Sequence, residues 1–351
     1  MITINEQKNK AISFLKMLEE KKKRPKRKFL WAGIKDKSFG IIFGPSKSGK
    51  TIFCENLAIK LAIGAASFFG FKLSGKPTKV LFVGLEEFWE NRVDRNLKQY
   101  SVLTEDEKKL FEDNYLYQHI DFHRHLTTIT QWANFKELIV NSQAEVVFVD
   151  SITRLNHGTM EDSRTAEEIM QRLHEVAIET DITLICVHHT PKMHEAPITM
   201  DKIKGSSVFA QESDFAYGIN RTSKGIRYLK TVFLRYADDT EEKVKGFKIN
   251  KSLWIELEDE DYEESFLQKS DRRRDDDKRD IIIKELNKYQ CISIPTKVLV
   301  KNLKPILGLK ERRIKELLSE LVKERKIINP NHGYYRSIEC LKMGGGNDEE
   351  E

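Results

Sequence analysis

Apolar runs alternate with helical patterns from residue 38 onwards. Apolar stretches of β-type residues occur at 39–43, 80–85, 145–149 and 182–187. Between them the sequence predicts helices at about 50–64, 88–99, 131–141 and 161–180. Strands that are apolar throughout and separated by helices are typical of a mostly parallel sheet with helices on both faces. The expected fold class is therefore α/β.

The pattern changes after the last of these strands. Three β-rich segments predict hairpins or edge strands that complete the sheet, at 213–222, 226–236 and 245–257. Residues 256–280 are almost wholly charged, which indicates a linker between domains. After it come three helical patterns and then a turn and strand, at 277–290, 294–307, 309–328 and 329–338. This order resembles a winged helix with its third helix in the recognition position.

Composition narrows the class of protein. With 351 residues, 39% hydrophobic and 33% charged, the chain is long enough for one large core and a small second domain. The four cysteines are far apart and form no CxxC pair, which argues against a disulfide framework and a zinc site. The N-terminus lacks a signal-peptide core, and the apolar stretch 57–71 is too short to span a bilayer. We expect a cytoplasmic protein with no membrane partner.

The segment "GPSKSGKT" matches the pattern GxxxxGK[ST] and lies between an apolar strand and a helix. In this context backbone N–H groups cradle phosphates at the N-terminus of the helix. Lys50 is then expected to reach the β- and γ-phosphates of ATP, and the Thr51 hydroxyl to ligate Mg²⁺. The expected nucleotide-binding residues are Gly44, Pro45, Ser46, Lys47, Ser48, Gly49, Lys50 and Thr51.

Polar pairs follow three further strands. They are Glu86-Glu87, Asp150-Ser151 and His188-His189. In a parallel sheet all these strands end at the edge where ligands bind. Asp150 suits the Mg²⁺ shell, and either glutamate suits the positioning and deprotonation of an attacking water. A histidine beside the γ-phosphate could sense whether that phosphate is present.

The order of "VLFVGLEEFWENRVDRNL", "VVFVDSITRL", "CVHHTPK" and "KGSSVFAQESD" after the P-loop resembles the RecA-type ATPases of the DnaB-like hexameric helicase group. It is closest to the hexameric replicative helicases of plasmids and mobile elements. The resemblance covers about residues 29–250 and implies a ring with ATP sites between subunits. It also implies that Glu86 is the catalytic glutamate, Asp150 the Walker B aspartate and His189 the γ-phosphate sensor, with Glu87 and His188 as alternatives.

An arginine finger is also implied. Arg235 falls where the family carries a finger that acts on the neighbouring subunit, which is typically worth about 10³ to 10⁵ in rate. Relatives often have a lysine two residues before it, where this chain has Phe233. Arg221 and Arg227 therefore stay open as alternatives.

Two regions are candidates for DNA contact. The segment after the histidines corresponds to a loop that faces the central channel in relatives, and it offers Lys192 and Lys204. Between Lys278 and Cys340 there are 15 Lys/Arg against 7 Asp/Glu, so positive charge gathers in the C-terminal region. The predicted third helix there begins with Lys310, Arg312, Arg313 and Lys315. We expect single-stranded DNA in the ring channel and duplex DNA at the winged helix.

These expectations divide the chain into five parts. They are a basic N-terminal arm (1–28), a RecA-like P-loop ATPase domain (29–257), a charged linker (258–277), a winged-helix domain (278–340) and a disordered acidic tail (341–351). The leading hypothesis is a Mg²⁺-dependent ATP hydrolase that forms a homo-oligomeric ring, with a hexamer favoured, and acts as a DNA helicase or replication motor of a plasmid, phage or integrated element. The alternatives are an ATP-gated DNA-binding regulator or loader without unwinding activity, and a defence or signalling ATPase whose winged helix docks a protein.

Overall fold

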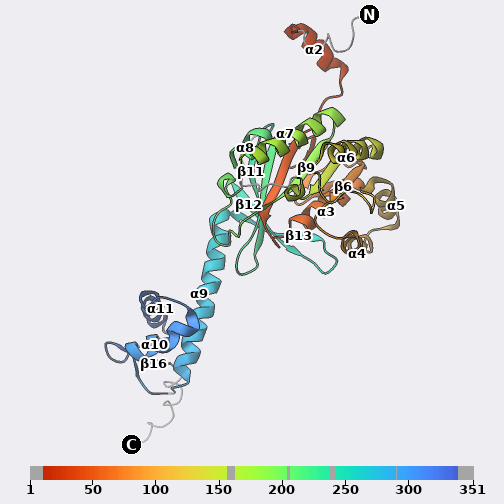
Figure 1. The fold of residues 1–351 in the computed structure, drawn as a ribbon. Helices are drawn as coiled ribbons and strands as arrows, with labels where there is room; N and C mark the ends of the chain where they lie inside the picture. The colour runs from red at the N-terminus through yellow and green to blue at the C-terminus, as the bar shows by residue number, and fades with distance from the viewer. Residues whose placement is uncertain (1–10, 156–162, 204–205, 238–241, 290, 339–351) are drawn as a thin grey trace, which may run out of the picture. The chain divides into compact units, whose positions relative to one another are not determined.

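The computed structural model describes residues 11–155, 163–203, 206–237, 242–289 and 291–338 (Figure 1). Chain contacts divide the protein into two compact units. Unit 1 comprises Met1–Arg221 and Gly225–Glu263, and unit 2 comprises Thr222–Lys224 and Glu264–Glu351. None of the described helices is long and apolar enough to cross a membrane.

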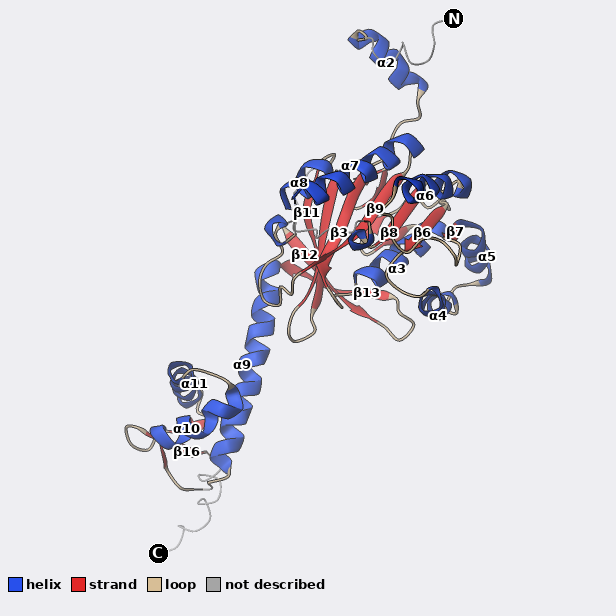
Figure 2. Ribbon diagram, viewed as in Figure 1, coloured by secondary structure: helices blue, strands red, loops and turns tan. Residues whose placement is uncertain are grey.

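Unit 1 is built on a nine-stranded sheet in the order β13-β12-β11-β10-β3-β9-β8-β6-β7 (Figure 2). In that order the strands are Ile255–Tyr262, Lys243–Ile249, Arg227–Leu234, Phe215–Arg221, Phe39–Pro45, Thr183–Thr190, Val146–Asp150, Val80–Gly84 and Tyr115–Tyr117. The six neighbouring strands β10, β3, β9, β8, β6 and β7 pair in parallel. Strands β11, β12 and β13 extend the sheet beyond β10 in antiparallel pairs. All parallel strands therefore end at one edge.

Helices cover both faces of this sheet (Figure 2). On one face lie α3 (Lys50–Ala62), α4 (Trp89–Tyr100) and α5 (Glu105–Asn114), and on the other α6 (Ile129–Ser142), α7 (Ser163–Thr180) and α8 (Ser206–Glu212). Strands β3, β6 and β8 are buried along their whole length, as strands covered on both faces must be. The remaining elements of unit 1 are α2 (Phe14–Lys23), β1 (Phe29–Trp31), β2 (Ile34–Lys35), β4 (Ser67–Phe68), β5 (Phe71–Lys72), η1 (Ile152–Arg154) and η2 (Met200–Lys202).

Unit 2 has its own small core. Its elements are α9 (Glu263–Asn287), β14 (Ile294–Pro295), α10 (Thr296–Leu307), α11 (Glu311–Lys323), β15 (Ile327–Ile328) and β16 (Tyr334–Ser337), with the sheet in the order β14-β16-β15. Residues from all three helices pack together there, including Leu286, Leu303 and Leu317. The α10 helix ends at Gly308 with φ of 62°, a left-handed conformation that glycine adopts without strain.

The α/β class with a mostly parallel, doubly covered sheet is confirmed, and several details differ from the sequence-based expectation, among them the helices α5 and α8, which were not predicted. Segment 213–222 forms β10, an internal strand parallel to β3, because its residues are buried on both sides. Strand β7 was not predicted, since three residues give too short an apolar signal. The expected linker 258–277 contains the end of β13 and the first part of α9. The tail 341–351 lies outside the described residues.

Candidate active site

The loop between β3 and α3 wraps around the N-terminus of α3. Two glycines are required there. Gly49 caps the helix with φ of 106°, which L side chains rarely adopt, and a Cβ on Gly44 would lie 1.9 Å from the carbonyl oxygen of Ile219. Pro45 closes β3, Ser46 and Lys47 are exposed, and Ser48 is buried. The helix N-terminus and its free N–H groups form a site suited to phosphate.

Lys50 is buried within this loop. Its Nζ donates to the carbonyl oxygens of Gly44 at 2.8 Å and Pro45 at 2.9 Å, and lies 3.3 Å from His189 Nδ1. Burial lowers the pKa of Lys50 to about 8, although Asp150 and Glu86 counteract the shift. A negatively charged ligand would offset this desolvation.

Thr51, in the first turn of α3, meets Asp150, the last residue of β8, at the carboxyl edge of the sheet. Thr51 Oγ1 donates to Asp150 Oδ2 at 2.6 Å, while Asp150 Oδ1 is buried without a hydrogen-bond partner among the described residues. Burial raises the pKa of Asp150. An unpaired buried carboxylate oxygen beside a hydroxyl is the oxygen donor set that Mg²⁺ prefers, so these two residues fit the ion.

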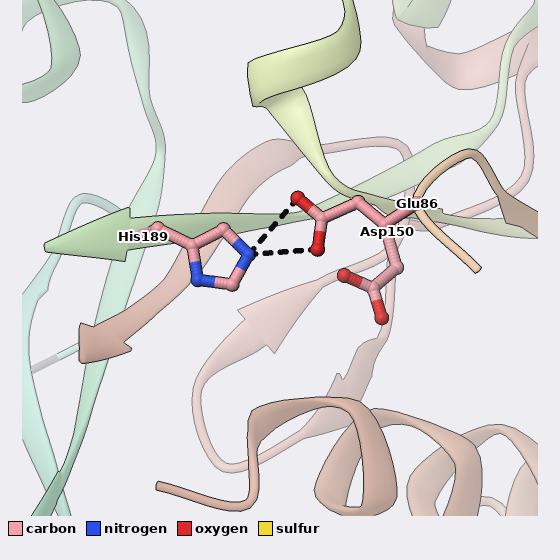
Figure 3. A group of neighbouring side chains, drawn as sticks. All are labelled: Glu86, Asp150 and His189. Carbon is pink, nitrogen blue, oxygen red and sulfur yellow. Dashed lines mark hydrogen bonds and ion pairs between the residues drawn. The ribbon is translucent and has the colours of Figure 1, made fainter. Parts of the chain in front are cut away.

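Glu86, which follows β6, faces the same place. His189 Nε2 lies 3.0 and 3.1 Å from its two carboxylate oxygens (Figure 3), Thr153 Oγ1 donates to it at 2.7 Å, and Ser151 Oγ also donates to it. Ligand atoms of Glu86, Asp150 and His189 lie within 4.8 Å of one another. Burial raises the pKa of Glu86, but the hydrogen bonds from His189, Ser151 and Thr153 outweigh it and bring the pKa to about 2.

The two histidines of β9 point to opposite sides of the sheet, as neighbours on a strand must. His189 is half-buried and faces Glu86 and Lys50. His188 is 1% exposed and stacks on Phe209 of α8, with ring centroids 4.7 Å apart. Only His189 is placed to meet a phosphate at this edge.

Glu87 belongs to an ion-pair cluster beside the site. Arg95 Nη1 donates to Glu87 at 2.8 Å and Arg95 Nη2 to the fully buried Glu55 of α3 at 2.6 Å. Arg92 lies 3.6 Å from Glu87 and 3.8 Å from Glu55. The cluster ties α4 to α3 and neutralises both arginines. Sequence reasoning missed it, although two arginines three residues apart share one face of a helix.

These residues line one cavity of about 300 Å³ at the carboxyl edge of the sheet. Its walls include the expected Lys47, Gly49, Lys50, Thr51, Glu86, Glu87, Asp150, His189 and Arg227, together with Arg92, Arg95 and Ile249, which were not expected. The structure thus brings the P-loop, the two expected carboxylates and one histidine together.

The three arginines considered as fingers lie in different places. Arg227 lines the cavity of its own chain, and Arg221 is exposed at the end of β10. Arg235 lies beyond the end of β11, where Nη2 donates to the Gln211 carbonyl at 2.6 Å and Nε lies 3.7 Å from Asp214. Asp214 accepts from Phe39 N at the start of β3, so Arg235 is about 20 Å, the length of that strand, from its own P-loop. Arg235 therefore cannot reach the phosphates of its own chain.

The expected DNA contacts are distributed over both units. Lys192 is exposed in the loop after β9, and Lys204 lies outside the described residues. In unit 2, Lys310 is exposed at the N-cap of α11. Within α11 the charges pair with one another: Arg312 with Glu316 at 3.1 Å, Arg313 with Glu316 at 3.1 Å and Glu320 at 3.2 Å, and Lys315 with Glu311 at 2.7 Å. Exposed ion pairs of this kind contribute about 0–1 kcal/mol to stability, so these cations can exchange their carboxylate partners for phosphates.

A parallel sheet with a phosphate-binding loop after one strand and carboxylates after its neighbours defines a P-loop nucleotide-binding ATPase core. The family model described as AAA domain matches residues 7–195, more than half of the chain. The chain belongs to this AAA domain family.

Comparison with solved structures gives a more distant likeness. A structure titled "ATPase Domain of G40P" is 16% identical in sequence, with a TM-score of 0.45, over 62% of this chain and 84% of that one. No protein among the curated ones matches the chain.

Proposed function

We propose that unit 1 hydrolyses ATP in a Mg²⁺-dependent reaction at the cavity described above. The observation that carries the proposal is the convergence of Lys50, the Thr51–Asp150 pair and the Glu86–His189 pair in one cavity at the N-terminus of α3. Structural ion pairs alone do not explain Asp150 Oδ1, which is buried and unpaired. A metal ion and phosphates satisfy both that oxygen and the desolvated Lys50.

Each residue then has a defined task. Thr51 and Asp150 hold Mg²⁺, which neutralises charge on the β- and γ-phosphates. Lys50 contacts the same phosphates, and the free N–H groups of the loop donate to them. Glu86 accepts the proton of a water whose oxygen attacks the γ-phosphorus, as the bond from that phosphorus to the β–γ bridging oxygen breaks. His189 hydrogen-bonds Glu86 and is positioned to donate to the γ-phosphate of a bound nucleotide.

We further propose that the protein forms a homo-oligomeric ring in which Arg235 acts on the neighbouring subunit. Two observations support this. Arg235 is partly exposed and too far from its own site, and α4 presents an exposed apolar stripe of Trp89, Val93 and Leu97, spaced one turn apart. Exposed apolar patches mark interaction sites. Six subunits are favoured by the sequence resemblance to DnaB-like helicases.

We propose that unit 2 is a winged-helix domain and that DNA is the substrate on which the ATPase acts. Its order of helix, short strand, two helices and two strands is that of a winged helix, and its positive charge supports contact with a polyanion. The proposed contacts are α11 with duplex DNA and the loop after β9 with single strands. The resulting activity is that of a helicase or replication motor of a mobile element.

The test is ATP turnover of the full chain with and without single-stranded DNA, at two salt concentrations. Two sets of neutralising substitutions, each removing two positive charges, separate the sites: Lys192→Gln with Lys202→Gln in the loop, and Lys310→Gln with Arg312→Gln at the start of α11. If only the loop substitutions abolish the stimulation of ATP turnover by single-stranded DNA, the result supports a motor that holds DNA in a channel. No ATP turnover in the wild type contradicts the hydrolase itself.

The same surface of α11 fits the regulator alternative, in which Lys310 at the N-cap and the cations that follow it contact duplex DNA. Such a protein would bind specific duplex DNA when ATP is bound, without needing hydrolysis. Footprinting with the Glu86→Gln variant separates the two. A full ATP-dependent footprint together with absent strand displacement by the wild type favours the regulator.

A further inference from the structure

Arg227 is a cation in the phosphate cavity that the proposed mechanism does not use. It is the first residue of β11 and pairs across the sheet with Arg221 and Phe247. From a Cβ placed on Gly49, its Cδ is 3.6 Å away and its Nε 3.7 Å away, so the guanidinium side chain lies against the residue that caps α3.

No anion of the described residues compensates this charge. Arg227 Nε is buried without a hydrogen-bond partner, and the structure gives Arg227 no ion pair within its described part. The other two arginines of the cavity, Arg92 and Arg95, are held by Glu55 and Glu87. Burial and the neighbouring Arg221 both lower the pKa of Arg227.

The position of Arg227 is unfavourable for a cation unless an anion lies nearby. The N-terminus of a helix carries about half a positive charge, which repels cations and attracts anions. Arg227 adds a second positive charge beside that terminus, and Lys50 adds a third within the same cavity. Asp150 and Glu86 offset the charge of Lys50, but the structure gives Arg227 no such carboxylate partner among the described residues, so an anion in this space would stabilise it.

We propose that Arg227 binds the phosphate chain of the nucleotide in its own subunit, at phosphate oxygens common to ATP and ADP. This inference rests on the proposed nucleotide site and adds a residue to it. The end of the phosphate chain that is hydrolysed lies beside Glu86 and His189, which contact each other, and His189 also contacts Lys50. Arg227 contacts none of these and lies on the Gly49 side, so it meets phosphates that remain after hydrolysis. It therefore acts in cis.

The test measures affinity for Mg-ADP and for a non-hydrolysable Mg-ATP analogue by calorimetry, on the full chain. Charge-assisted hydrogen bonds to phosphate are strong, so Arg227→Gln should weaken both ligands about 10- to 100-fold. Arg227→Lys keeps the charge and should recover part of the loss. Arg221→Gln removes the neighbouring exposed arginine and is the matched control, with less than about a 2-fold change.

Thermal unfolding without nucleotide separates a ligand contact from a structural role. Removing an uncompensated cation should leave the Tm of nucleotide-free Arg227→Gln unchanged or raise it. Unchanged affinity for both ligands, or a lower Tm with unchanged affinity, overturns the inference while the proposed site stands. A lower affinity for the ATP analogue with an unchanged affinity for ADP overturns the assignment of Arg227 to phosphates that ATP and ADP have in common. A wild type that binds neither ligand overturns the nucleotide site as well.

Discussion

His189 Nε2 lies 3.0 Å from a carboxylate oxygen of Glu86, which joins the end of β9 to the segment after β6 across β8 (Figure 3). On its other side the same ring lies 3.3 Å from Lys50 Nζ. The imidazole therefore stands between the residue that would hold the γ-phosphate and the residue that would activate water. A γ-phosphate entering this space would compete for both hydrogen bonds.

Glu86→Gln is expected to keep nucleotide binding and lower ATP turnover at least about 100-fold, the usual contribution of a general base. Glu87→Gln is the matched control, because it changes the neighbouring carboxylate to the same amide. It should leave Arg92 and Arg95 less well paired and lower stability by about 1–3 kcal/mol, while most turnover persists. Steady-state ATPase assays and chemical denaturation measure the two effects, and the opposite pattern would assign catalysis to Glu87.

His189→Ala should raise the pKa of Glu86, because His189 is the strongest of the hydrogen-bond donors that lower it. An activating base works only when ionised, so the acidic limb of the pH–rate profile should move to higher pH. Affinity for ADP should change little, since ADP lacks the γ-phosphate. The profile of kcat against pH is the measurement. A variant with the wild-type acidic limb would show that the observed hydrogen bond does not set the basicity of Glu86.

Nucleotide binding should depend on pH through Lys50. Its pKa of about 8 in the folded protein lies below the ordinary value of 10.5, so the unfolded chain binds more protons between these pH values. Lys50 thus destabilises the nucleotide-free protein below pH 8, and this loss is relieved as the pH rises towards 10.5. ADP binding requires the charged form and should take up a proton, so affinity should fall up to about tenfold per pH unit above pH 8.

Calorimetry in two buffers of different ionisation enthalpy, without magnesium, gives the number of protons taken up at pH 9. Lys50→Arg is the control, because an arginine stays charged and should take up none. Equal heats in both buffers for the wild type would contradict a lowered pKa at Lys50.

Arg235→Ala should abolish most ATP turnover, and so should Lys50→Ala, but mixtures of the two should recover activity. In a mixed ring some interfaces receive an intact P-loop from one subunit and an intact arginine from the next. Turnover across mixing ratios, with ring size checked by light scattering, is the measurement. Absence of recovery at every ratio, in rings shown to mix, would count against a finger in trans.

Glu263→Gln should loosen the loop that follows β9. Glu263 is 4% exposed and accepts from Ile198 N at 2.6 Å and Tyr228 Oη at 3.0 Å, and it also pairs with Lys230. Neutralising it leaves Lys230 poorly compensated, which should lower stability by about 1–3 kcal/mol. Hydrogen exchange of residues 191–203 should increase more than that of β3. Glu258→Gln is the control, because Glu258 and its partner Lys248 are both exposed, and it should change neither stability nor exchange.

The sequence by itself determined the class of fold and the edge where the site lies. Apolar strands separated by helices permit little except a covered parallel sheet, and in such a sheet the polar pairs at 86–87, 150–151 and 188–189 must gather beside the P-loop. Local chemistry is enough for these inferences, because strand direction and the glycine-rich turn are encoded within a few residues.

Tertiary structure was needed to determine which glutamate contacts His189 and which histidine faces the cavity. Glu86 and Glu87 have the same side chain, but of the two only Glu87 forms ion pairs with Arg92 and Arg95 of α4 among the described residues. Successive side chains of β9 point to opposite faces of the sheet, so His189 faces the cavity and His188 packs in the core against Phe209. Arg227 reaches Gly49 because β11 runs antiparallel beside β10. These choices depend on strand register and side-chain packing between segments far apart in the chain, which residue type and local spacing do not specify.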